Sequence, residues 1–139
     1  MAFKNEIVLQ RNIPQLRKHL LQEQWKTAHN KLPGKIAIPS PKGYIFISAL
    51  EILYCHSQSN YTEFYLTNKT KIISSYTLGL YEDILNDLNF FRIHRSCMIN
   101  LEYLKSYKKE NGGSVVMSDG HEIKISRRNK VNFMKLFKE

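Results

Sequence analysis

Two short stretches of the chain place cationic side chains where stability alone gives them little reason to be. The first, FFRIHRSCMIN at residues 90–100, sets Arg92, His94 and Arg95 inside a run that is otherwise typical of a hydrophobic core. If the apolar residues of this run are buried, strand alternation points Arg92 and His94 the other way. Arg95-Ser96 then falls in a turn, where an arginine can bind guanine or grip a phosphate. Taken alone, an ordinary exposed arginine is the commoner explanation.

The second stretch, SRRNK at residues 126–130, begins a predicted helix with three cations in its first turn. Unpaired backbone N–H groups already make a helix N-terminus positive, so Asp or Glu is the stabilising choice there. Arg127 and Arg128 cost roughly a few tenths of a kcal/mol, yet together with the helix dipole they create an anion site. This pattern favours contact with phosphate or bases over a merely solvated basic turn.

Catalytic and metal chemistry find little support. Cys55-His56 and His94-x-x-Cys97 supply the ligand types of a zinc site. However, neighbouring residues on a strand face opposite ways and the usual C-x₂-C spacing is missing, so we expect no metal. Cys97 is typical of a small buried hydrophobe. The sequence shows no phosphate-binding glycine loop, nucleophile elbow or paired carboxylates, and we therefore expect neither an enzyme nor a cofactor.

Local patterns predict the elements that position these residues. Residues 12–30 form an amphipathic helix, with Asn12 as its cap and Pro14 in its first turn. After the break at Pro33-Gly34, the hydrophobic period changes from 3.6 towards 2. Short strands in antiparallel hairpins are expected at residues 35–38, 44–47, 52–55, 61–66, 71–74, 115–117 and 122–124.

Two short helices complete the predicted elements. Thr77 caps one of them, whose apolar residues are Tyr81, Ile84, Leu85 and Leu88. Ser126 caps the closing helix, for which we expect Val131, Met134 and Phe137 on the inner face. The prediction is a mostly β fold of short antiparallel strands with minor helices, preceded by the N-terminal amphipathic helix.

Composition narrows the class of partner. The 139 residues suit one domain with an extension and carry a net charge of +9, with a pI near 9.6. Residues 1–42 and 92–139 each carry a net charge of +6, whereas residues 43–91 carry −3. Segregated positive charge favours a polyanionic partner. With no bilayer-spanning run and no secretory signal, we expect a soluble cytoplasmic protein that does not bind membranes.

Taken in chain order, several motifs resemble the LytTR family of bacterial DNA-binding domains. They are ILY at 52–54, SNYT at 59–62, TL at 77–78, FRIHRS at 91–96, INL at 99–101, DG at 119–120 and ISRR at 125–128. The resemblance covers about residues 35–138. It departs from the family at Cys97 and Met98, where members often have an aromatic or aliphatic pair.

The resemblance implies a fold of small antiparallel sheets and a sequence-specific transcriptional regulator. Family members commonly insert loops into successive major grooves of double-stranded DNA at paired direct repeats in promoters, and they bend the DNA. Carried over by position, the base-reading side chains are Asn60, Arg95 and Arg128. The expected phosphate-holding residues are Ser96, Lys124, Ser126, Arg127 and Lys130.

The resemblance also bears on domain organisation. We expect a helical extension or linker at residues 1–33 and the DNA-binding domain at residues 34–139. Such domains usually follow a receiver domain, for which about 33 residues leave no room. The chain is therefore either the excised end of a response regulator of a two-component system or a stand-alone regulator. A homodimer on DNA and a receiver or sensor partner outside the chain are both compatible with it.

Two other functions stay open from the residues themselves. The first is a basic protein-interaction module that binds nucleic acid only non-specifically and loses that binding as salt rises. The second is single-stranded nucleic-acid binding, with Tyr61, Phe64 and Tyr65 as a stacking platform. Aromatic residues at such positions are more often core residues and cross-strand pairs.

Overall fold

The computed structural model describes residues 15–138, with side chains described from residue 22 onward. The chain forms two compact units, Met1–Ala49 and Leu50–Glu139. The predicted functional boundary between residues 33 and 34 stays a prediction, because compactness alone does not define a functional domain. None of the helices in residues 15–138 is long and apolar enough to span a membrane.

In the described part of the first unit, from residue 15 onward, a helix and a short 3₁₀ helix precede a hairpin. Its elements are α2 (Gln15–Ala28), η1 (His29–Lys31), β1 (Lys35–Ser40) and β2 (Gly43–Ser48). β1 and β2 pair antiparallel, as the sequence predicts. His29 joins helix to hairpin, since Nδ1 lies 2.8 Å from the Trp25 carbonyl and Nε2 accepts a 3.0 Å hydrogen bond from the Ala37 N–H. The predicted cap Asn12 and first-turn Pro14 lie outside the described residues.

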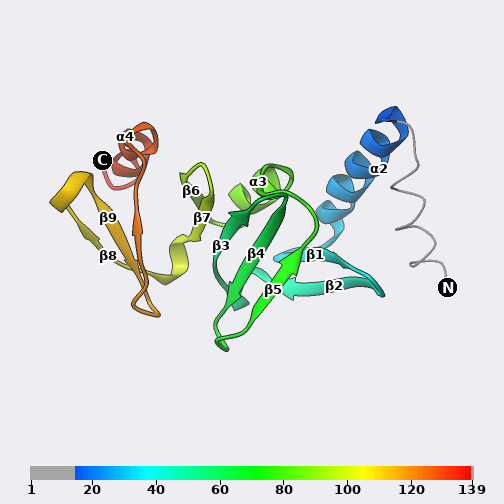
Figure 1. Ribbon diagram of the computed structural model, residues 1–139, viewed down its shortest axis with the longest axis horizontal. Coiled ribbons are helices and arrows are strands. Elements are labelled where there is room, and N and C mark those ends of the chain that lie inside the picture. Colours follow the sequence, from blue (N-terminus) through cyan, green and yellow to red (C-terminus); the bar gives the residue numbers. More distant parts are fainter. Residues whose placement is uncertain (1–14, 139) are drawn as a thin grey trace. The chain divides into compact units, whose positions relative to one another are not determined.

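The second unit contains two antiparallel sheets. The five-stranded sheet has the order β5-β4-β3-β7-β6 and the three-stranded sheet the order β10-β9-β8 (Figure 1). The strands of the first sheet are β3 (Ile52–Gln58), β4 (Tyr61–Leu66), β5 (Lys71–Ser74), β6 (Phe90–His94) and β7 (Cys97–Asn100). Those of the second are β8 (Leu104–Lys108), β9 (Ser114–Met117) and β10 (Glu122–Lys124). The predicted mostly β fold is confirmed.

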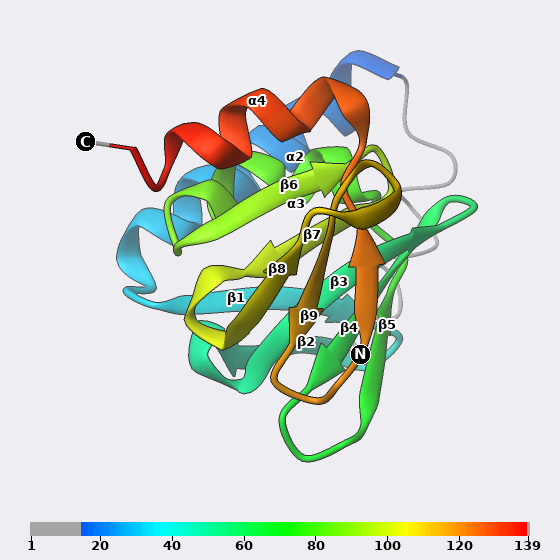
Figure 2. The same ribbon diagram turned by 90° about the vertical axis from the view of Figure 1, so that its left-hand side faces the viewer.

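Helices and single turns connect these strands. The helices are α3 (Leu78–Asn86) and α4 (Arg127–Lys135), and the 3₁₀ turns between strands of this unit are η3 (Leu101–Tyr103) and η4 (Glu110–Gly112). A further 3₁₀ turn, η2 (Ala49–Glu51), lies in the chain between β2 and β3. α3 contacts β6 and β3, and α4 contacts β6, beside which it is drawn in Figure 2. Thr77 occupies the predicted cap position of α3, although its side chain makes no capping hydrogen bond.

Two groups of buried side chains hold the second unit together. In the first group, Tyr81 of α3 packs edge-on against Phe64 with ring centroids 5.0 Å apart, and its hydroxyl lies 2.6 Å from the Ser74 hydroxyl. The second group joins the two sheets and α4. Its members are Leu53, Tyr54, Ile93, Cys97, Ile99, Val115, Met117, Ile123, Ile125 and Phe133. Burial raises the pKa of the Cys97 thiol to about 12, so this cysteine is a protonated core residue.

The inner face of α4 differs from the prediction. Phe133 is 1% exposed, whereas Val131 and Phe137 are 62% and 59% exposed. Phe133 packs against the rings of Phe91 and Tyr107, at centroid distances of 5.5 and 5.9 Å. Met134 is partly buried against the core, as predicted. The prediction failed for Val131 and Phe137 because a nine-residue helix offers several apolar stripes of similar strength. The position of β6, which the helix pattern does not contain, selects among them.

Candidate nucleic-acid interface

The three predicted base-reading residues lie on three separate turns. Asn60 follows Ser59 in the two-residue turn between β3 and β4, and Arg95 lies in the turn between β6 and β7. Arg128 lies in the first turn of α4. All three side chains are exposed. We call the residue ranges 59–60, 95–96 and 127–130 together the turn cluster.

Backbone hydrogen bonds bring these turns to the same end of the five-stranded sheet. The Ser57 N–H, near the end of β3, donates to the Ser96 carbonyl at 2.7 Å. The Ser126 N–H, at the start of α4, donates to the Ile93 carbonyl of β6 at 3.1 Å. Since β3, β7 and β6 are antiparallel neighbours, the first bond joins the β3–β4 turn to the β6–β7 turn. The second bond fixes α4 to the same strand end.

The backbone of the β6–β7 turn is held by two of its own side chains. The Arg92 guanidinium donates to the His94 carbonyl at 3.1 Å and also to the Arg95 carbonyl. His94 Nδ1 accepts a 3.1 Å hydrogen bond from the Ser96 N–H and lies 3.2 Å from the Ser96 hydroxyl. These contacts fix the backbone conformation of the turn from which the exposed Arg95 side chain projects.

Simple strand alternation predicts that Arg92 and His94 project together into solvent. In the structure they do not. The pairing of β6 with β7 shifts by one residue between them, which is the signature of a β-bulge. Arg92 lies opposite Met98, and its guanidinium forms a 2.6 Å ion pair with Glu82 of α3. The only sequence signal that Arg92 holds this turn is its position three residues before Arg95. Strand alternation alone predicts that Arg92 is simply a solvated side chain.

His94 is an uncharged member of this arrangement. Burial, followed by the charges of His56, Arg92 and Arg95, lowers the pKa of His94 below its ordinary value of 6.5. The geometry agrees, because a ring nitrogen that accepts the Ser96 N–H cannot also carry a proton. The turn is thus built around a neutral imidazole.

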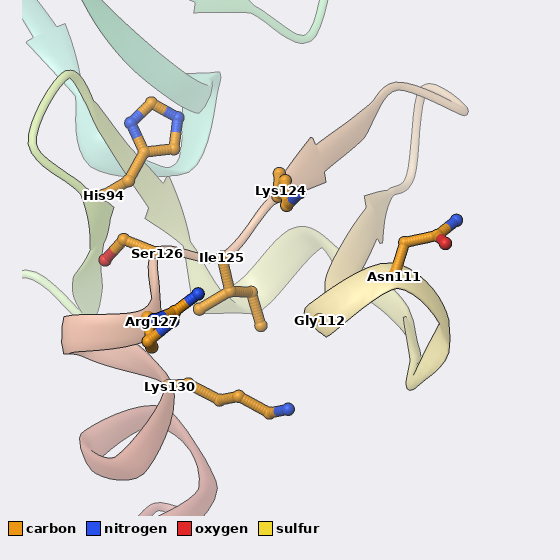
Figure 3. Close-up of a pocket in the computed structure, with 8 residues that line it drawn as sticks. All are labelled: His94, Asn111, Gly112, Lys124, Ile125, Ser126, Arg127 and Lys130. Carbon is orange, nitrogen blue, oxygen red and sulfur yellow. The ribbon is translucent and has the colours of Figure 1, made fainter.

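A basic groove lies beside the start of α4. Its lining residues are His94, Asn111, Gly112, Lys124, Ile125, Ser126, Arg127 and Lys130, which Figure 3 draws as sticks. Ser126 caps the helix as predicted, and its hydroxyl accepts a 3.2 Å hydrogen bond from the Asn129 N–H. All three predicted phosphate-holding cations, Lys124, Arg127 and Lys130, therefore line one groove across from the η4 loop. That loop was not predicted to belong to the site.

The charges of the turn cluster and of this groove are unpaired within the described residues. Elsewhere in the second unit some cations have acidic partners, as in Lys71–Glu63 at 3.4 Å and Lys108–Glu122 at 3.2 Å, whereas others, such as Lys69, Lys105 and Lys109, have none among the described residues. The cations of the turn cluster and of the groove, namely Arg95, Lys124, Arg127, Arg128 and Lys130, likewise make no ion pair with any described residue. Unpaired cations gathered beside exposed turns form a surface suited to phosphates and to the acceptor edges of bases.

Comparison with known proteins agrees with this assignment. The family model of the LytTr DNA-binding domain matches residues 42–138. The sensory transduction protein LytT of Bacillus subtilis (strain 168) is 26% identical over 106 residues, which are 73% of this chain and 44% of that protein. The chain thus spans less than half the length of this relative.

A solved structure shares the fold. The LytTr DNA-binding domain of a response regulator from Bacillus cereus matches with a TM-score of 0.65 at 19% identity. The match covers 76% of this chain and 98% of that domain. At this level of identity the likeness shows the arrangement of strands and helices, and the functional assignment depends on the family match.

Proposed function

The chain belongs to the LytTR family of DNA-binding domains, and we propose that it is a sequence-specific transcriptional regulator that binds duplex DNA through the turn cluster. The observation that carries the proposal is the pair of backbone hydrogen bonds, Ser57 to Ser96 and Ser126 to Ile93, which gather three exposed turns at one sheet end. Paired strands flank the first two turns, and α4 is hydrogen-bonded to β6 at its start, so the projecting side chains are positioned before DNA arrives.

Each side chain has the hydrogen-bonding groups that its proposed role requires. Arg95 and Arg128 can each donate two parallel hydrogen bonds to O6 and N7 of guanine, and Asn60 can pair with N6 and N7 of adenine. The cations of the basic groove, Lys124, Arg127 and Lys130, are assigned to phosphates, with Ser96 and Ser126 as neutral contacts. In this scheme phosphates set the register, and the three base contacts supply the specificity.

We further propose that the turns, rather than a helix laid along the groove, enter the major groove. Phe133 anchors the second half of α4 in the core, and Arg127 and Arg128 in the first turn are exposed to solvent. Paired direct repeats and bending of the DNA are part of the same proposal and rest on the family resemblance. Two copies of the chain would then occupy one promoter site, with signalling supplied by a receiver or sensor partner.

Selection of bound duplexes from a random pool, at low and at physiological salt, tests the function. A recurring motif in the enriched pool, present as two spaced direct repeats, supports the regulator. Loss of all binding as salt rises, with no enriched motif, would favour the basic protein-interaction module instead. Single-stranded competitors added to the same reactions separate duplex binding from stacking on exposed aromatic residues.

Bending needs its own measurement. The selected motif is placed at different positions along otherwise identical fragments, and the mobility of each complex is compared in a gel. A bend makes the mobility depend on position, because a central bend shortens the end-to-end distance most. Mobility that does not depend on position would refute the bending part of the proposal and leave sequence-specific binding intact.

A further inference from the structure

We propose that Arg92 is a positioning residue for DNA recognition, which clamps the β6–β7 turn so that Arg95 meets its base in a fixed orientation. This inference rests on the proposed function, in which Arg95 contacts a base. It assigns to Arg92 a role that acts through the turn and requires no contact of its own with DNA. The argument depends on three hydrogen bonds from one guanidinium group.

The first step is the geometry of the guanidinium. Its Nε donates to the His94 carbonyl at 3.1 Å, one terminal nitrogen donates to the Arg95 carbonyl, and the other forms the 2.6 Å ion pair with Glu82. Two successive carbonyls of the turn are thereby fixed by one rigid, planar group. The five donors of arginine lie in a fixed fork, so rotation of the turn would break at least one of these bonds.

The second step is the support behind the clamp. Glu82 belongs to α3, whose neighbouring residues Tyr81 and Leu85 are fully buried against the sheet. Glu82 therefore sits on an anchored helix and not on a mobile loop. The Arg92 side chain is 24% exposed and that of Glu82 is 37% exposed. The ion pair thus links Arg92, whose other donors hold the turn, to α3.

The third step separates positioning from stability. An ion pair this exposed contributes little to folding, with a typical range of about 0–1 kcal/mol. We therefore expect the buried residues of the unit to stay in place when the pair is lost. A displacement of about 1 Å at a contact residue, however, is enough to lose a bidentate hydrogen bond to a base. The main effect of removing the clamp is therefore expected on specificity rather than on folding.

A double-mutant cycle in the complete 139-residue chain tests the inference. The variants are Arg92→Gln, Arg95→Ala and the double variant, with Lys71→Gln as a control that removes one ion-paired cation. Lys71 forms its ion pair with Glu63 and lies opposite Tyr65 in the β4–β5 pairing, at the other end of the sheet from the turn cluster. Dissociation constants are measured for the selected motif and for a scrambled duplex, and folding is followed by thermal denaturation.

We expect Arg92→Gln and Arg95→Ala each to weaken binding to the motif by about tenfold, the size of one lost bidentate contact. The double variant should bind the motif no more weakly than Arg95→Ala alone, because Arg92 acts through Arg95. Binding to the scrambled duplex should change less than threefold in Arg92→Gln (about 0.65 kcal/mol). The Lys71→Gln control should leave the ratio between motif and scrambled duplex unchanged.

The other outcomes have distinct meanings. Additive losses in the double variant, or equal losses on both duplexes, would overturn the positioning role and make Arg92 an independent contact or a general cation. An unchanged motif preference in Arg95→Ala would instead refute the proposed base contact itself. If Arg92→Gln does not fold, Arg92→Lys decides, because lysine keeps the charge near Glu82 but cannot reproduce the fork. A folded Arg92→Lys that keeps full motif preference, or an unfolded one, overturns the inference.

Discussion

Arg128 and Lys130 lie two residues apart in the first turn of α4, yet we expect their removal to weaken DNA binding in different ways. Lys130 lines the basic groove together with Lys124 and Arg127, whereas Arg128 is exposed outside the groove lining. The proposed assignment gives phosphate contacts to the three groove cations and a base contact to Arg128. The variants Lys130→Ala and Arg128→Ala therefore test the division of labour within one helical turn.

The expected magnitude follows from counterion release. Three phosphate contacts give a slope of log affinity against log salt of about −2.7, since each contact contributes about −0.9. Between about 50 and 200 mM salt, these contacts weaken binding by about 40-fold. Without Lys130 the slope falls to about −1.8 and the same change in salt weakens binding by about 12-fold. The unmodified protein and Lys130→Ala have all other cations in common, so the difference between their slopes gives the contribution of Lys130 alone.

Arg128→Ala should leave that slope almost unchanged on a scrambled duplex. On the selected motif it should cost roughly 1–3 kcal/mol and relax the preference at one base pair. Fluorescence anisotropy titrations at several salt concentrations, with both duplexes and both variants, give all the quantities. Lys71→Ala is the matched control, because Lys71 is paired with Glu63 at the other end of the sheet. Identical slopes and identical motif losses for the two variants would refute the assignment.

Three further predictions concern the scaffold of the site. Phe133→Ala should lower the free energy of unfolding by about 3–5 kcal/mol, because it empties a buried site. Phe137→Ala should lower it by far less, because Phe137 is 59% exposed. Chemical denaturation measures both free energies. The lowered pKa of His94 means that the neutral ring stabilises the fold above about pH 6.5 and that this stability is lost as the pH falls below it. Unfolding titrations from about pH 7.5 to about pH 5.5 should therefore show a steeper loss in the native protein than in His94→Asn, and equal slopes would contradict the neutral-ring geometry. Ser126→Ala removes the cap on the Asn129 N–H and should cost about 1 kcal/mol in the same assay, whereas Ser118→Ala, in the exposed β9–β10 turn, should cost much less.

Local features of the fold were predictable because they depend on neighbours in the sequence. The hairpin between β9 and β10 turns at Asp119-Gly120, where Gly120 has a φ of +89° that other residues rarely adopt. Ser126 was predicted as a cap because its side chain needs only the N–H three residues later. In both cases the physical cause lies within a few residues of its effect, and the pattern is visible in the sequence.

Non-local features were not predictable on the same basis. The insertion of β7 between β3 and β6 depends on pairing between Tyr54 and Ile99, which no local pattern encodes. The burial of Phe133 depends on where β6 lies, and the clamp of Arg92 depends on a bulge and on Glu82 of a different element. The base-reading assignments came from resemblance to a family and stay predictions, since their test requires DNA.

The geometry of the turn cluster also explains how the fold stays stable although it places cations at positions that lower stability. The unfavourable first turn of α4 is offset by the Ser126 cap and by Phe133, which anchors the helix through the core. The turn at Arg95 is fixed by contacts from Arg92 and His94, and these leave the Arg95 side chain exposed. Stability is thus supplied by groups that face the sheet, while the projecting groups stay unpaired.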